Sequence, residues 1–109
     1  MNSEGNTSRH EIDSTDMKKL DTILKQMKKA IAKALPDNPN LYYVDAFPDI
    51  IKEHAKQSDF DFMLYSIGRL SGYVTCLYLN NKVDEMLFTS VDNLLLSLQA
   101  CCFRMNRGR

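Results

Sequence analysis

The sequence predicts an all-α protein, a small bundle of four helices. Hydrophobic residues recur at intervals of three and four over long stretches, which is the spacing of one helix face. The three prolines cluster between residues 36 and 48 and leave long uninterrupted segments on both sides. One stretch, Phe62 to Leu79, is apolar nearly all round, as expected of a helix buried among other helices or of a membrane span. With 109 residues, the chain is long enough for one domain and too short for two.

The first helix is expected from Asp16 to Leu35, with Ser14 or Thr15 as its cap. Residues 1–14 before it are polar and aperiodic, and they predict a disordered N-terminal arm. The apolar positions of this helix step by 3, 4, 3, 4 and 3, which is a heptad seam. They are Met17, Leu20, Leu24, Met27, Ile31 and Ala34. The favoured interpretation is an amphipathic helix on the side of the domain, and the alternatives are a dimer-forming coiled coil and a phosphate-contacting lysine face.

The second helix is expected from Ala46 to Gln57, after a turn-rich linker, LPDNPN, and a short helical turn within LYYVDAF. Asp45 is expected to cap it, because a side-chain carboxylate can accept from the free N–H groups of the first turn. Pro48 is tolerated in that first turn. His54 lies beside the apolar positions and is expected to be half-buried and hydrogen-bonded.

The third helix is expected from Asp59 to Asn80, with Ser58 opening a capping box and Asn80-Asn81 forming a left-handed stop. One stripe of this helix is expected to face the interior. It consists of Phe60, Met63, Ile67, Leu70, Val74 and Leu77. A second face carries Gly68, Gly72 and Cys76 and forms a groove of small residues. Since glycine inside a helix costs up to about 1 kcal/mol relative to alanine, this groove predicts a close helix crossing, within the chain or across a two-fold axis.

The fourth helix is expected from Glu85 to Met105, with Asp84 as its cap and Val83 packed against its first turns. Its seam repeats the heptad spacing. The seam positions are Leu87, Val91, Leu94, Leu98, Cys101 and Met105. Because only a few residues join the third and fourth helices, they must form a C-terminal antiparallel αα-hairpin. The chain is thus divided into the arm, a single helical domain over residues 15–105, and a basic tail over residues 106–109.

A membrane span is the alternative for the stretch Phe62 to Leu79, which is just long enough to cross a bilayer. Arg69 would then lie near the bilayer centre, at a cost of about 2.5–3.5 kcal/mol. Asp59 and Asp61 flank the stretch closely. The buried central helix is therefore favoured, and no membrane partner is expected.

The charges are segregated along a chain whose net charge is zero. Residues 16–35 hold six lysines against two aspartates, a net charge of +4, and residues 36–63 hold two lysines against six acids, a net charge of −4. This layout favours attraction between neighbouring segments or neighbouring chains. The three cysteines form an odd set, and residues 1–14 show no apolar signal segment, so we expect free thiols in the cytoplasm.

No motif for catalysis is present. The sequence contains no glycine-rich phosphate-binding loop and no paired-cysteine metal motif. The adjacent residues Cys101 and Cys102 diverge by roughly 100° on a helix and are expected to be small core residues. We therefore expect no catalytic residue, no cofactor and no metal, and the chain is not expected to be an enzyme.

The function favoured by these observations is protein binding. The third and fourth helices are apolar over more than one face, and tyrosine is enriched at protein interfaces. We expect a small helical adaptor, inhibitor or regulator of bacterial, phage or mobile-element type, which binds itself as a homodimer, another protein, or both. The expected contact residues are Tyr42, Tyr43, Tyr65, Gly68, Gly72, Tyr73 and Tyr78.

The alternative is a nucleic-acid-binding regulator that uses the lysine face of the first helix and the C-terminal arginines. Its contact residues would be Lys18, Lys25, Lys28, Lys29, Arg104, Arg107 and Arg109. The neutral total charge and the lack of a recognisable recognition helix weigh against it.

Overall fold

The computed structural model describes residues 14–37 and 39–108, and within them it shows an all-helical chain with four α-helices packed together, as predicted. The helices are α2 (Ser14–Ala34), α3 (Phe47–Lys56), α4 (Phe60–Leu79) and α5 (Glu85–Arg107). Two short 3-10 helices, η1 (Leu35–Asp37) and η2 (Pro39–Val44), lie between α2 and α3. The predicted disordered arm, apart from Ser14, lies outside the described residues.

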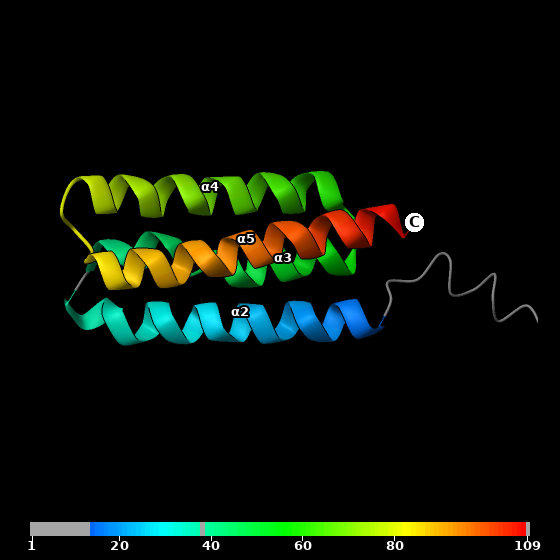
Figure 1. Cartoon of the computed structure of the whole chain (residues 1–109), viewed down its shortest axis with the longest axis horizontal. Coiled ribbons are helices and arrows are strands. Elements are labelled where there is room, and N and C mark those ends of the chain that lie inside the picture. The colour runs from blue at the N-terminus through cyan, green and yellow to red at the C-terminus, as the bar shows by residue number, and fades with distance from the viewer. Residues whose placement is uncertain (1–13, 38, 109) are drawn as a thin grey trace, which may run out of the picture.

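The four α-helices run side by side, with α2 and α4 at opposite edges of the bundle in Figure 1. α5 fills one side between them and packs against both, while α3 packs against α4 and α2 on the other side (Figure 1). Residues 80–84 join α4 to α5. Since α3 has 10 residues and α4 has 20, α3 alone covers only part of that side, and η2 contacts α4 further along.

The interior is built from one apolar stripe of each helix. The predicted stripe of α4 is confirmed, since Phe60, Met63, Ile67, Leu70 and Val74 are buried and Leu77 is partly buried. The seam of α2 faces the same interior through Leu20, Leu24, Met27 and Ile31. The amphipathic interpretation of α2 is therefore confirmed, and the seam that a dimeric coiled coil would have needed is used within the bundle.

The predicted start of α5 and end of α4 are confirmed. Asp84 caps α5, because its carboxylate accepts a hydrogen bond from the Leu87 backbone N–H at 2.7 Å. Asn81 adopts a left-handed backbone with φ of 59°, and the following Lys82 N–H donates to the Leu77 carbonyl at 2.7 Å. This is the hydrogen-bond pattern of a Schellman motif, which ends α4 at the residues predicted.

The prediction that Ser58 caps α4 is wrong. Ser58 has a φ of 56°, and the next residue, Asp59, donates its N–H to the His54 carbonyl at 2.9 Å. Ser58 is therefore the left-handed residue that closes α3, and it cannot also adopt the extended backbone of a helix cap. Asp59 is the cap instead, accepting from the Phe62 N–H at 3.4 Å.

The prediction that Asp45 caps α3 is also wrong. The cap position is Ala46, whose backbone is already helical and whose side chain makes no capping bond. The Asp45 N–H instead donates to the Tyr42 carbonyl at 3.4 Å, which continues the turn from η2. Pro48, in the first turn of α3, lacks an N–H, so one fewer donor needs a cap there.

Two of the predicted helix boundaries also differ in the structure. α2 begins at Ser14, so Ser14 and Thr15 are helical and the cap position falls outside the described residues. α5 continues to Arg107, two residues into the predicted tail.

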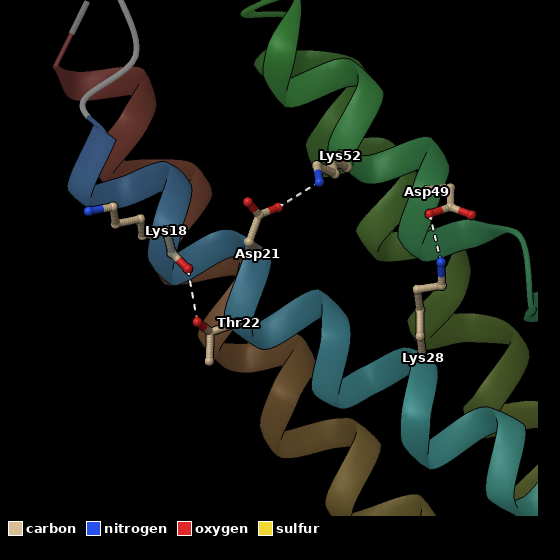
Figure 2. A network of polar contacts seen from close by, with 6 residues as sticks. All are labelled: Lys18, Asp21, Thr22, Lys28, Asp49 and Lys52. Carbon is tan, nitrogen blue, oxygen red and sulfur yellow. Dashed lines mark hydrogen bonds and ion pairs between the residues drawn. The ribbon is translucent and has the colours of Figure 1, made fainter.

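Oppositely charged side chains meet where α2 lies beside α3. Lys28 of α2 pairs with Asp49 of α3 at 3.1 Å, and Lys52 of α3 pairs with Asp21 of α2 at 2.9 Å (Figure 2). The partners are at least one third exposed, and exposed ion pairs each contribute only about 0–1 kcal/mol. These pairs therefore align the two helices more than they stabilise the fold.

We predict that Leu70→Ala lowers the free energy of unfolding by about 2–5 kcal/mol, because the Leu70 side chain is fully buried and its removal leaves a cavity. Leu79→Ala is the matched control on the same helix, since Leu79 is 71% exposed, and it should cost less than about 0.5 kcal/mol. Urea denaturation followed by far-ultraviolet circular dichroism measures both. Equal costs for the two variants would contradict the orientation of α4.

Candidate functional site

The face of α4 opposite its buried stripe is exposed and almost uncharged. We define the outer face of α4 by its exposed aromatic, glycine and arginine positions, which are Phe62, Tyr65, Gly68, Arg69, Gly72 and Tyr73. Phe62 is 57% exposed and Tyr65 is 59% exposed. Within α4, only Asp61 and Arg69 carry charge at exposed positions. Large aromatic side chains thus lie in solvent where a helix surface normally carries charges.

Arg69 lies among aromatic rings. Its guanidinium carbon is 5.6 Å from the Phe47 ring centroid, 5.7 Å from that of Tyr65 and 5.9 Å from that of Tyr73. A hydrogen bond from Arg69 to the Tyr73 side chain, and then the charge interaction with Tyr65, raise the pKa of Arg69 above its usual value. No carboxylate among the described residues forms an ion pair with Arg69. The cation is thus positioned by aromatic rings and not by an acid.

The Arg69 side chain belongs to a groove between α3 and α4 of about 360 Å³. Phe47, Ile50 and His54 line it from α3, and Phe62, Tyr65 and Tyr73 line it from α4. The His54 ring stacks on Phe62 with centroids 5.7 Å apart. The prediction that His54 is half-buried is confirmed, but its buried Nδ1 has no hydrogen-bond partner among the described residues.

The predicted close helix crossing at Gly68 and Gly72 is absent from the described part of the chain. A Cβ added at either glycine would have no atom within 4 Å, apart from its own helix and chain neighbours. Both glycines lie on the exposed side of α4, because the interior stripe takes up the opposite side. The intrachain version of that prediction is therefore wrong, and the groove of small residues is open.

The structure brings together some of the predicted contact tyrosines and separates others. Tyr65 and Tyr73 lie on the outer face of α4, and Tyr42 is exposed in η2. Tyr78 is instead partly buried, because its ring stacks on Phe88 at 4.3 Å and its hydroxyl donates to the Glu85 carboxylate at 3.4 Å. The side chain of Tyr43 lies outside the described part of the structure.

α5 also presents apolar side chains to solvent. Leu96 is 57% exposed and Phe103 is 53% exposed, with Ala100 between them, and Met86 is exposed near the start of the helix. None of the exposed positions from Met86 to Phe103 is charged. Among the described residues, α5 is the helix whose length and apolarity would suffice to cross a membrane, and 28% of that stretch is buried. We call Leu96, Ala100 and Phe103 the outer stripe of α5.

The predicted basic contact residues do not form one surface. Lys18 and Arg104 line a groove of about 500 Å³ between α2 and α5, together with Lys19 and the hydroxyl residues Thr15, Thr22 and Ser97. Arg104 also lies 3.6 Å from the Asp16 carboxylate. Lys28 is paired with Asp49 on the α3 side of α2 (Figure 2). Lys25 and Lys29 are exposed on α2, Arg107 is exposed at the end of α5, and Arg109 lies outside the described residues.

The cysteine side chains favour no catalytic use. Cys76 is exposed, whereas Cys101 and Cys102 are buried in the core, as expected of small core residues. Burial raises the pKa of both buried thiols, and that of Cys102 reaches about 11. The thiolate is the nucleophilic form, so these two thiols are inert near neutral pH. No group of three potential metal ligands occurs among the residues that the structure places.

Sequence reasoning missed most lining residues of the α3–α4 groove as parts of a surface, among them Phe47, Phe62 and Arg69. The spacing of Tyr65, Arg69 and Tyr73 at i, i+4 and i+8 was the available signal, since such residues stack along one helix face. The contribution of Phe47 could not be found in this way, because it depends on how α3 packs against α4.

Comparison of the chain with protein-family models, with curated protein sequences and with solved structures finds no significant match in any of the three.

We predict that a disulfide reagent at pH 8 modifies one thiol of the native protein, that of Cys76, because it alone of the three is exposed. Raising the pH to 9 should leave Cys102 unmodified, since a thiol with a pKa of about 11 is only about 1% ionised there. All three thiols should react in denaturant. Modification of two or three thiols at similar rates in the native protein would contradict the burial of Cys101 and Cys102.

Proposed function

We propose that this protein is a non-enzymatic protein-binding module that acts through the outer face of α4. The observation that carries the proposal is the exposure of Phe62, Tyr65 and Tyr73, which remain 43–59% exposed although α3 packs beside them. Exposed aromatic clusters of this kind typically mark protein interaction surfaces.

The geometry of this face suits a helix or an extended segment of a partner. The surface of α4 is open at Gly68 and Gly72, and the aromatic side chains lie beside the two glycines, toward α3. The backbone of a partner can approach closely at glycine. The large rings next to the glycines would then be buried under that partner. Full burial of one such side chain contributes about 1.5–3 kcal/mol.

The proposal retains the class expected from the sequence, a small helical adaptor, inhibitor or regulator of bacterial, phage or mobile-element type. The small helical domain and the inert buried thiols favour binding over chemistry. The free thiols at Cys76, Cys101 and Cys102 fit a reducing cytoplasmic setting.

Selection of random short peptides on the immobilised full-length chain tests the function. We predict that soluble versions of the selected peptides bind the double variant Phe62→Ser/Tyr65→Ser at least about tenfold more weakly than the wild type, because two aromatic contacts are lost. Met86→Ser is the control, since Met86 is 79% exposed on α5 and belongs neither to the outer face of α4 nor to the outer stripe of α5, and this variant should bind as the wild type does. If the peptides bind Phe62→Ser/Tyr65→Ser as tightly as they bind the wild type, the proposal is wrong.

We also propose that α4 and α5 form a C-terminal antiparallel αα-hairpin that pairs with a second copy through the outer stripe of α5. A five-residue link and direct packing of the two helices support the hairpin. Charge complementarity supports an antiparallel pair of α5 helices, because Glu85 lies in the first turn and Arg107 in the last. An antiparallel two-fold pair would bring each Glu85 near Arg107 of the other copy and Leu96 near the axis.

We predict a mass of twice the chain mass by light scattering, and a monomer after Leu96→Glu, because two carboxylates would be buried near the two-fold axis. Leu79→Glu places the same change on an exposed leucine of α4 and should leave the dimer intact. A monomeric wild type at all concentrations, or a dimer unaffected by Leu96→Glu, would contradict this arrangement.

The alternative function, nucleic-acid binding, has one observation in its favour, the gathering of Lys18, Lys19 and Arg104 along the α2–α5 groove. Against it, Arg104 and Lys28 lie close to acidic side chains, which weakens their attraction for phosphate. We expect no saturable binding of single-stranded or duplex DNA or RNA in low-salt buffer by fluorescence anisotropy. Binding that falls steeply with salt and is lost in Lys18→Gln/Lys19→Gln would favour the alternative instead.

A further inference from the structure

Arg69 differs from three other basic residues of the bundle in having no acidic partner within the described part of the chain. Lys28, Lys52 and Arg104 each lie within 4.0 Å of a carboxylate. Around Arg69 the structure instead places the rings of Phe47, Tyr65 and Tyr73, at 5.6–5.9 Å from the guanidinium carbon. The guanidinium has five N–H donors, and Tyr73 is one of the rings beside it.

The rings fix the position of this cation and leave it accessible. Cation–π contacts favour a guanidinium over a ring face, but they do not satisfy its N–H donors. The groove around Arg69 has a volume of about 360 Å³, which is large enough for one or two side chains of a ligand. An acceptor placed there would form charge-assisted hydrogen bonds beside apolar surface.

We infer that the outer face of α4 binds an acidic segment of a partner protein, in which the carboxylate of an Asp or Glu seats on Arg69 between the aromatic rings. The inference rests on the proposed function and names the chemistry of its partner. A carboxylate matches the planar guanidinium in a bidentate pair. An apolar side chain next to the acid in the partner would cover Phe62 and Ile50, which are exposed along the same groove.

Two other occupants fit the charges less well. Nucleic acid is recognised by several cations along its backbone, whereas Arg69 is the one lysine or arginine that lines this groove among the described residues. A second copy of this chain, paired about a two-fold axis at Gly68 and Gly72, would place Arg69 near its own copy because it lies between the two glycines. Two like charges at the centre of an interface oppose association.

The peptides selected on the full-length chain test the inference. We expect them to share an Asp or Glu beside an apolar residue. A peptide of this kind should bind the wild type about 10-fold to 100-fold more tightly than an otherwise identical peptide with Asn or Gln in place of the acid. In Arg69→Gln that advantage should vanish, so that both peptides bind equally. Arg69→Lys should recover part of it, because an ammonium keeps the charge without the planar fork.

Lys29→Gln is the control variant, because Lys29 is also an exposed basic residue but lies on α2, and it should keep the preference for the acid. Circular dichroism confirms that each variant is folded. If the Asn or Gln peptide binds the wild type as tightly as the acidic peptide does, while both lose affinity for Phe62→Ser/Tyr65→Ser, the carboxylate inference fails and the proposed function stands. If no selected peptide needs Phe62 and Tyr65, the proposed function itself fails.

Discussion

The interior of the bundle has room for one stripe of each helix, and the rest of the structure follows from that constraint. In α4 this stripe is Phe60, Met63, Ile67, Leu70 and Val74, all buried. A helix of a small bundle cannot bury more than about that width, because its remaining positions point away from the other helices. α4 is apolar over nearly its whole circumference, so Phe62, Tyr65 and Tyr73 remain exposed.

The same constraint separates the two hydrophobic surfaces of the molecule. The outer face of α4 has aromatic rings, two glycines and one cation with no acidic partner among the described residues, whereas the outer stripe of α5 has Leu96, Ala100 and Phe103 with no charge among its exposed neighbours. A surface with such a cation favours a chemically different partner. A surface with an acid at one end and a base at the other favours its own copy.

Local spacing in the sequence predicted much of the fold. The stripe of α4, the seam of α2, the Asp84 cap and the left-handed Asn81 each depend on residues within a few positions of one another, and all are present. Ser58 and Asp45 were predicted wrongly because each was treated as the start of one helix. In the structure Ser58 completes the end of α3, and Asp45 continues the turn from η2.

The site was less predictable from the sequence than the fold. Tyr65 and Tyr73 were predicted as contact residues, but the groove is also lined by Phe47 and Ile50 of α3, whose positions depend on long-range packing. The close crossing predicted at Gly68 and Gly72 was left open between the chain itself and a two-fold axis, and no such crossing occurs among the described residues. Periodicity predicts which residues share a face, and it does not predict which faces the other helices leave uncovered.

Hydroxyl-radical footprinting of the unmodified protein, read out by mass spectrometry, tests most directly the claim that α4 buries one stripe and exposes its aromatic face. Methionine is among the most easily oxidised residues, so the protection of a methionine reports burial sensitively. The structure predicts early oxidation of Phe62 and Tyr65 on α4 and of Met86 on α5, with Met63 and Met27 protected. Oxidation of Met63 as fast as Met86, together with protection of Phe62 and Tyr65, would show that α4 is rotated and would contradict the account.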